Sequence, residues 1–168
     1  MRSTIWIALA LSMVPIVSHA AGQAQPGAAQ GEQSAENKLI VEAAFARWAA
    51  GGTGFFQEVL APDVVWTIEG SGPSAGIFRG RDALLAAIAP FTRRLAVPVR
   101  PVAYRVWVDG DHVVIHWTGE ATTLDGRAYR NRYAWIFRME SGRAVEVNAF
   151  LDLAPYDAVI ARVPLPRE

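Results

Sequence analysis

Residues 99–153 limit the possible folds more than any other part of the chain, because they read as four consecutive β-strands joined by tight turns. Each segment alternates β-branched or aromatic residues with polar ones, as half-buried strands do. The segments are VRPVAYRVWVDG (99–110), DHVVIHWTGEATT (111–123), RAYRNRYAWIFRM (127–139) and RAVEVNAFLDL (143–153). Their joints are Asp109-Gly110, Asp125-Gly126 and Ser141-Gly142, pairs that favour hairpin turns. The pattern predicts a mostly antiparallel sheet and excludes a parallel sheet with helical crossovers.

The residues before this meander predict helices and one further strand. Apolar residues recur at helical spacing from Asn37 to about Ala50, and Gly51-Gly52 ends that helix. A short helix is expected over 55–60, a strand over 64–69 and a helix over 81–91. Separate helical and antiparallel β segments indicate an α+β domain.

The stretch GPSAG (72–76) matches the nucleophile-elbow pattern G-x-S-x-G, with Ser74 in the place of the nucleophile. An elbow needs its serine on a sharp turn that leads at once into a helix of a parallel α/β sheet. Here GIFRG (76–80) intervenes before the helix, and the following strands are antiparallel. We therefore expect a rim loop rather than an esterase site.

The first 20 residues resemble a secretory signal peptide, with one Arg, an apolar run from Ile5 to Val17 and small residues at Ser18 and Ala20. An uncleaved anchor or a buried helix is the alternative, although the run is shorter than the roughly 20 residues of a membrane span. We expect a periplasmic or secreted protein with a disordered leader (21–36), one domain (37–163) and a short tail (164–168), and no stable membrane span after cleavage.

Composition narrows the possible partners and chemistries. Removal of Arg2 with the signal reduces the 16 Lys and Arg residues to 15, against 16 Asp and Glu, and no basic run occurs. A nucleic-acid partner therefore has little electrostatic support. The chain has no cysteine, which excludes thiol catalysis and thiolate metal sites.

Two stretches resemble the SnoaL-like group of the nuclear transport factor 2-like superfamily, which also contains ketosteroid isomerases. VVWTIEGSGPSAGIFRGRDALLAAI (64–88) is similar to the group's strand, glycine-rich loop and helix. DGRAYRNRYAWIFRMESGRAVEVNAFLD (125–152) is similar to its last two strands. The resemblance implies a cone, in which a curved sheet wraps around N-terminal helices and leaves one pocket. It does not specify the reaction, since members include isomerases, cyclases, dehydratases, hydrolases and binding proteins.

Strand alternation selects the side chains that we expect in this pocket. In 127–139 the aromatic set faces inward, which places Asn131, Tyr133 and Trp135 there. In the last strand the corresponding set contains Asn148, Phe150 and Asp152. Trp48 and Trp66 complete the predicted lining. For Asn131 and Tyr133, hydrogen bonding that merely holds the cone together is the alternative.

Two carboxylates are candidate general bases. Asp152 is expected inward, where desolvation raises a carboxyl pKa toward useful values; capping the end of the strand or pairing with Arg79 is the alternative. Glu69 lies near the base of the ketosteroid isomerases when the chains are matched, and a solvated rim position is its alternative. The resemblance places Trp48 near their donor tyrosine and Ala134 or Tyr133 near their protonated aspartic acid, so two of the three parts differ and the sequence does not predict steroid isomerisation.

The histidines do not predict a metal site. His112 and His116 are separated by roughly 13 Å along one strand face, too far to chelate one ion. His116 is a possible base, as in some dehydratase relatives, but the opposite face of its strand is the more apolar.

Three functions remain open. The first is an acid/base enzyme without a cofactor, acting on a small apolar molecule that bears a carbonyl or a ring, with Asp152 or Glu69 moving a proton and Tyr133 and Asn131 stabilising negative charge. The second is a noncatalytic small-molecule binder, and the third a dimeric assembly module. A homodimer through the outer face of the sheet is expected, because strand 99–110 has apolar residues on both faces.

Overall fold

The computed structural model describes residues 26–165 and shows an α+β fold. The helices are α1 (Pro26–Ala49), α2 (Phe55–Val59), α3 (Arg81–Thr92) and α4 (Leu153–Arg162). The strands are β1 (Leu60–Ile68), β2 (Gly76–Arg79), β3 (Leu95–Asp109), β4 (His112–Thr123), β5 (Ala128–Glu140) and β6 (Arg143–Leu151). The predicted signal peptide, residues 21–25 and residues 166–168 lie outside the described range.

The strands form one sheet in the order β2-β1-β6-β5-β4-β3. β1 runs parallel to β6, and the other neighbouring pairs are antiparallel. The mostly antiparallel meander is therefore confirmed. The segment GIFRG, expected in a loop, instead supplies edge strand β2, because Gly76–Arg79 pairs with β1.

The hairpin signals in the sequence correspond to real turns. Ser141 and Gly142 join β5 to β6 with φ values of 48° and 75°. Positive φ at both central residues is the signature of a type I′ turn, whose twist matches that of the two strands. Ser141 is the one non-glycine residue with positive φ in the described range, which shows how closely the hairpin constrains this position.

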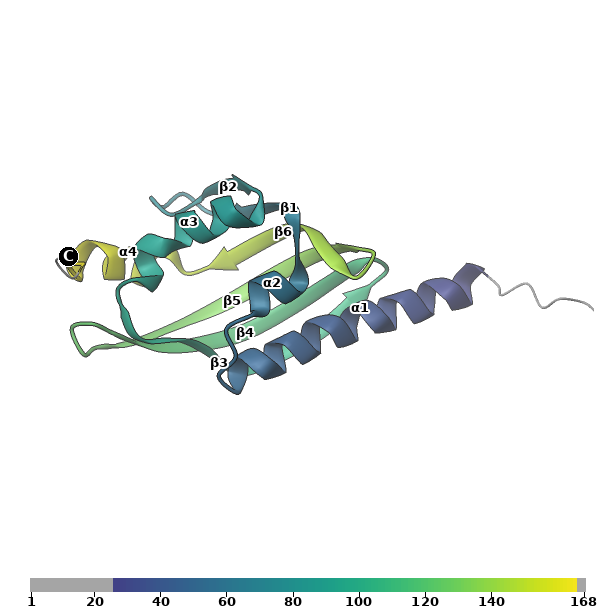
Figure 1. Ribbon diagram of the computed structural model, residues 1–168, viewed down its shortest axis with the longest axis horizontal. Helices are drawn as coiled ribbons and strands as arrows, with labels where there is room; N and C mark the ends of the chain where they lie inside the picture. The colour runs from purple at the N-terminus through teal and green to yellow at the C-terminus, as the bar shows by residue number, and fades with distance from the viewer. Residues whose placement is uncertain (1–25, 166–168) are drawn as a thin grey trace, which may run out of the picture.

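The helices cover the inner face of the sheet (Figure 1). α1 runs along β3, α3 lies near β1 and β2, and α2 lies between them. The main core is enclosed between these helices and the sheet, with fully buried Phe45, Leu60 and Phe137 among its members. α4 packs against α3 and β5 and closes a second apolar cluster around Tyr129 and Tyr156. This arrangement of helices inside a curved sheet agrees with the cone that the resemblance implies.

The leader predicted to be disordered is helical from Pro26 onward, so that α1 begins well before Asn37. Much of this segment is alanine, glutamine and glutamate, which are good helix formers. The Ser34 hydroxyl also donates to the carbonyl of Gly110 at 2.7 Å, which ties the helix to the β3–β4 turn. Within residues 26–165, every helix is too short or too polar to reach across a lipid bilayer.

A β-bulge in β6 changes which of its side chains face inward. Met139 pairs with Ala144, but Arg138 pairs with Glu146, so Val145 is an extra residue on the β6 side. Before the bulge Ala144 faces inward, and beyond it the inward residues are the odd-numbered ones instead of the even-numbered ones. Val147 and Ala149 are buried, while Asn148 is half-buried and Phe150 is 45% exposed.

Candidate functional site

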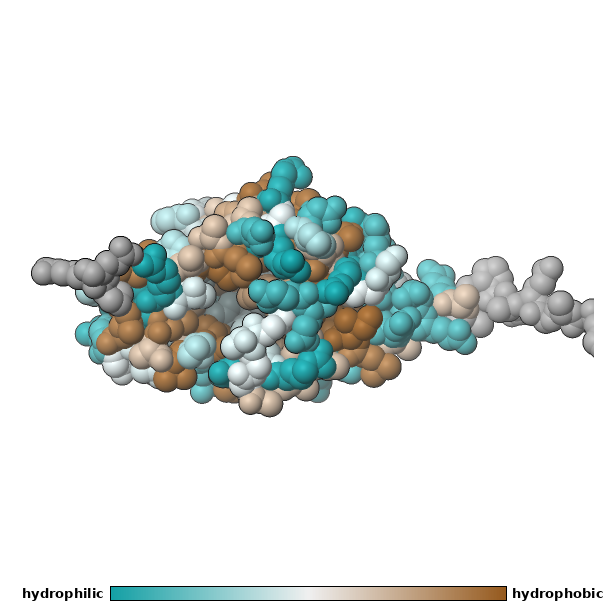
Figure 2. Space-filling view, viewed as in Figure 1, coloured by the Kyte–Doolittle hydropathy of each residue, from teal (hydrophilic) through white to brown (hydrophobic). Residues whose placement is uncertain are grey.

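The inner face of the sheet holds a cavity of about 100 Å³. Side chains from all four helices and from β1, β3, β4, β5 and β6 line it: Trp48, Phe56, Trp66, Ile68, Leu84, Ile88, Phe91, Thr92, Val99, Trp117, Tyr133, Trp135, Ala149, Leu151 and Tyr156. Figure 2 shows a hollow on this face of the molecule, bordered mainly by apolar residues. The sequence predicted Trp48, Trp66, Tyr133 and Trp135 as pocket residues, and the fold brings these four together.

Closely packed aromatic rings form much of the cavity wall. Trp117 stacks on Tyr133 with ring centroids 3.9 Å apart and an interplanar angle of 12°. Trp66 meets Trp135 edge-on at 5.1 Å, an arrangement that the ring quadrupoles favour. Such contacts stabilise the wall in one conformation, because interlocked rings have few alternative packings.

A network of phenol groups extends the wall toward α4. The Tyr129 and Tyr133 hydroxyls are 2.9 Å apart and share a hydrogen bond. Burial raises the pKa of Tyr129 above its ordinary value and raises that of Tyr133 well above it. Burial likewise raises the pKa of Tyr156, whose ring stacks on Phe91 at 4.1 Å. At neutral pH these phenols are therefore uncharged hydrogen-bond donors rather than bases.

Replacement of Tyr156 by phenylalanine is expected to reduce the alkaline sensitivity of the fold. Because the folded-state pKa of Tyr156 is raised, its contribution to stability is fully present below pH 10 and is lost as the pH rises through the folded-state value. Each such tyrosine costs about 1.4 kcal/mol of unfolding free energy per pH unit above 10. Denaturant titrations at pH 8 to 11 measure this loss. A loss as steep in the variant as in the wild type contradicts the prediction.

Asn131 does not line the cavity, contrary to expectation, although it is only 4% exposed. Its amide nitrogen donates to the Tyr129 hydroxyl and to the backbone carbonyl of Asp152, both at 2.8 Å. Its side-chain oxygen accepts from the backbone N–H of Arg132 at 2.7 Å and of Asp152 at 3.2 Å. Asn131 therefore holds the end of β6 against β5, which was the structural alternative.

Asp152 is exposed and does not reach the cavity, so its predicted inward position is wrong. It directly precedes α4, and its carboxylate accepts from the backbone N–H of Ala154 at 3.1 Å. This is helix N-capping, which aspartate performs well. The bulge in β6 is the cause, since it reverses the inward phase before the strand ends.

The remaining predicted site residues, Glu69, Asn148 and Phe150, also lie away from the cavity lining. Glu69 follows β1 and is half-buried, and its backbone N–H donates to Ala149 at 2.9 Å. The lining side chains of β1 are Trp66 and Ile68, so alternation sends Glu69 to the other face. Asn148 and Phe150 lie on the outer face of the sheet, because of the same bulge.

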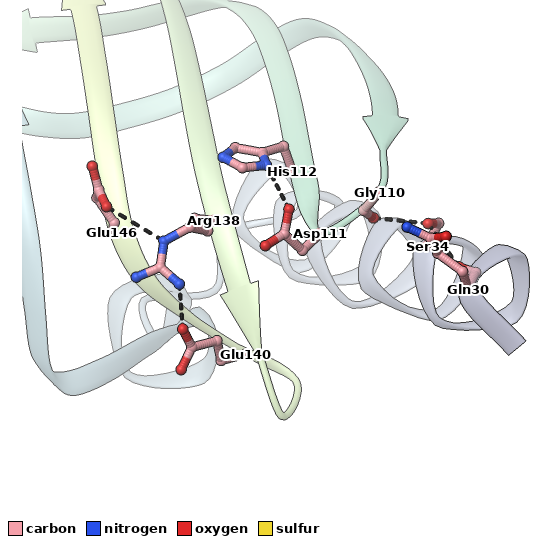
Figure 3. Close-up of polar contacts among 8 residues, drawn as sticks. All are labelled: Gln30, Ser34, Gly110, Asp111, His112, Arg138, Glu140 and Glu146. Atoms are coloured by element: carbon pink, nitrogen blue, oxygen red, sulfur yellow. Dashed lines mark hydrogen bonds and ion pairs between the residues drawn. The ribbon is translucent and has the colours of Figure 1, made fainter. Parts of the chain in front are cut away.

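Ser74 takes part in a contact between its loop and a helix. Its hydroxyl donates to a carboxylate oxygen of Asp157 at 2.5 Å and fastens the GPSAG loop to α4. Of the described residues, the two histidines are both on exposed positions of β4. His112 pairs with Asp111 at 2.6 Å, next to Arg138, which lies between Glu140 and Glu146 (Figure 3). No group of three or more potential metal ligands occurs in residues 26–165.

Sequence reasoning missed two important residues of the wall, Trp117 and Tyr156. Trp117 belongs to the apolar face of β4, so alternation already indicated an inward position. Tyr156 lies on α4, for which the sequence analysis predicted no element, since its last strand ended at residue 153. The apolar spacing of Tyr156, Val159 and Val163 behind a capping aspartate is the signal that identifies this helix.

Comparison with known proteins places the chain in a family. The model of the SnoaL-like domain matches residues 41–147. No match was found among curated proteins. Bal32a from a soil-derived mobile gene cassette is similar in structure, with a TM-score of 0.63, 19% identity, and coverage of 76% of this chain and 98% of that one.

Two other solved structures show the same fold. An NTF2-like protein of unknown function from Burkholderia pseudomallei K96243 has a TM-score of 0.59 and 23% identity, covering 74% of this chain and 97% of that one. TerC, co-crystallised with polyporic acid, has a TM-score of 0.59 and 21% identity, covering 75% of this chain and 98% of that one. The chain belongs to the SnoaL-like domain family and has the nuclear transport factor 2-like fold.

Proposed function

We propose that this protein binds a small, neutral, mostly apolar molecule in the cavity, as a noncatalytic binding protein. Membership of the SnoaL-like family fits either cofactor-free catalysis or binding of small molecules. The observation that favours binding is the cavity wall, which consists of aromatic and aliphatic side chains with a few indole and hydroxyl groups. Asp152 and Glu69, the expected bases, lie away from it.

The size of the cavity limits the size of the ligand. At about 100 Å³ it is smaller than an engineered cavity of roughly 150 Å³ that admits benzene. The inner part of the cavity therefore has room for about one small ring, and a larger ligand extends through its opening. TerC, which has the same fold, was co-crystallised with the small molecule polyporic acid, and this supports a small-molecule role for the fold.

Replacement of Ala149 by valine is expected to abolish binding of a small apolar probe. Ala149 is 1% exposed and lines the cavity from β6, so two added methyl groups occupy space that the ligand needs. Methylenecyclopentane is the probe, with saturable shifts of cavity resonances in NMR titrations as the readout. We expect binding in the roughly millimolar range for the wild type and at least about tenfold weaker binding for Ala149→Val.

Ala103→Val is the matched control, because Ala103 is exposed on the outer face of the sheet at β3. It is expected to bind the probe as the wild type does. If the wild-type protein shows no saturable shifts, or if both variants bind it with undiminished affinity, the proposed binding site is wrong.

We also propose that two copies pair through the outer face of the sheet. Trp107, Val114 and Ile136 occupy aligned positions on three neighbouring strands there, and Trp107 is 47% exposed. Phe150 adds a second large exposed ring on this face. Exposed rings beside partly exposed aliphatic side chains on one face are typical of protein interfaces.

Replacement of Trp107 by aspartate is therefore expected to convert a dimer into a monomer at micromolar concentration, as measured by light scattering. The control is Leu39→Asp, which changes an equally apolar, 64% exposed residue on α1 and leaves the dimer intact. A monomeric wild-type protein at these concentrations refutes the proposed interface.

A periplasmic or secreted location remains a proposal that rests on residues 1–20 alone. Their apolar run and small residues favour cleavage after Ala20. The intact mass of the exported protein tests this, because a mass that retains residues 1–20 contradicts cleavage.

A further inference from the structure

Cross-strand pairing arranges the side chains on the outer face of the sheet in rows. The central row consists of Trp107, Val114, Ile136 and Asn148. The row on one side of it, here called the arginine row, consists of Arg105, His116, Ala134 and Phe150. The row on the other side, the aspartate row, consists of Asp109, His112, Arg138 and Glu146. A mostly apolar row therefore lies between two rows that contain charges.

On β3 these rows place a cation, an aromatic ring and an anion in succession. Arg105, Trp107 and Asp109 are all exposed, and alternation directs them to the same face. The Arg105 guanidinium lies 5.9 Å from the centre of the Trp107 ring. Within residues 26–165, neither Arg105 nor Asp109 makes an ion pair. Both charges are therefore available to a partner.

The two outer rows differ in the sign of their charge. The arginine row contains no carboxylate. In the aspartate row, Arg138 is already paired with Glu140 and Glu146, and His112 is paired with Asp111 (Figure 3). The charge of Asp109 is left without a counterion there. One side of the central row is therefore basic and the other acidic.

This pattern distinguishes between the ways in which two copies can face each other. Two identical sheets that pack face to face are related by a two-fold axis lying in the interface. An axis parallel to the strands sets each row against the same row of the partner, so that Arg105 meets no carboxylate. An axis along the central row reverses the strands and sets the arginine row against the partner's aspartate row. Packed sheets are about 10 Å apart, a gap that an arginine and an aspartate can bridge together.

We propose that the outer face recognises a second copy of this chain with its strands reversed, so that Arg105 of each copy pairs with the partner's Asp109. The two Trp107 rings then meet at the two-fold axis. This inference rests on the proposed pairing through the outer face, and it adds the orientation and the residues that determine it. Complementary charges of this kind act mainly on specificity, because wrong orientations bring like charges together or leave charges unpaired.

Charge reversal at the two positions tests the contact. Arg105→Glu and Asp109→Arg are each expected to weaken the homodimer at least roughly tenfold, because the two-fold axis repeats every repulsive contact. An Arg105→Glu chain and an Asp109→Arg chain complement each other at both contacts. In an equimolar mixture, the heterodimer is therefore expected to exceed the proportion given by random pairing. Native mass spectrometry counts the species, since the two variants differ in mass.

The double variant and a control complete the experiment. Arg105→Glu/Asp109→Arg restores opposite charges within one chain and is expected to dimerise within about threefold of the wild type. Lys38→Glu is the matched control, because it makes the same change of charge on α1. Its pair with Glu42 at 3.6 Å is exposed and contributes little, so this variant is expected to dimerise as the wild type does. Circular dichroism checks that each variant is folded.

The outcomes separate this inference from the proposed pairing. If the wild type dimerises and Trp107→Asp disrupts the dimer, but the charge variants keep full affinity or mix at random, only the assigned orientation is wrong. The same conclusion follows if both single variants weaken the dimer and the double variant does not restore it. If the wild-type protein is monomeric, the proposed pairing is wrong as well.

Discussion

Replacement of Asn131 by alanine is expected to lower the free energy of unfolding by about 3 kcal/mol, since a buried group left without its partner typically costs about 1–3 kcal/mol. The side chain bonds to the Tyr129 hydroxyl and to both the N–H and the carbonyl of Asp152. Alanine leaves these groups unpaired at the point where β6 ends and α4 begins. Urea denaturation followed by far-ultraviolet circular dichroism measures the change.

Asn148 is the matched control for this prediction. It was expected in the same pocket, but it is half-buried on the outer face of β6. Asn148→Ala is therefore expected to change stability by less than about 0.5 kcal/mol. If instead Asn131→Ala leaves stability intact and abolishes probe binding, Asn131 is a ligand contact and the structural role assigned to it is wrong.

Replacement of Gly119 by alanine is expected to destabilise the protein and to disturb the cavity. A Cβ atom at this inward position of β4 lies 2.8 Å from Trp117, 2.9 Å from Val99 and 3.0 Å from Tyr133. These distances are too short, so the stacked pair must shift. Overpacking of this kind typically costs about 1–3 kcal/mol. We expect Gly119→Ala to lose that stability and to weaken binding of methylenecyclopentane, as measured by denaturation and NMR titration.

Gly31→Ala provides the opposite result for comparison. Gly31 lies in α1 with nothing within 4 Å of an added Cβ. Alanine is a better helix former than glycine by about 1 kcal/mol, so this variant is expected to lose no stability. A Gly119→Ala variant as stable as Gly31→Ala, with unchanged probe binding, refutes the role of Gly119 in making room for the Trp117–Tyr133 pair.

Local patterns in the sequence were sufficient to predict most of the fold. The turn pairs at 109–110, 125–126 and 141–142 each connect two neighbouring strands. Alternation in β5 correctly indicated that Tyr133 and Trp135 face inward, because this strand pairs with β4 without a register shift. In a regular strand the backbone geometry points successive side chains to opposite faces of the sheet. The inward-facing residues can therefore be predicted from the sequence of that one strand.

The positions of Asn148, Phe150 and Asp152 depended on tertiary structure. Strand alternation counts residues along one segment, but the bulge at Val145 results from pairing with β5. One extra residue sends every later side chain to the opposite face. Asp152 consequently caps α4 instead of entering the cavity, and Tyr156 reaches the cavity from that helix. The sequence by itself therefore determined the cone and its aromatic wall. Which polar groups reach the cavity was decided by cross-strand register, because register is a relation between two strands and is not encoded in either strand alone.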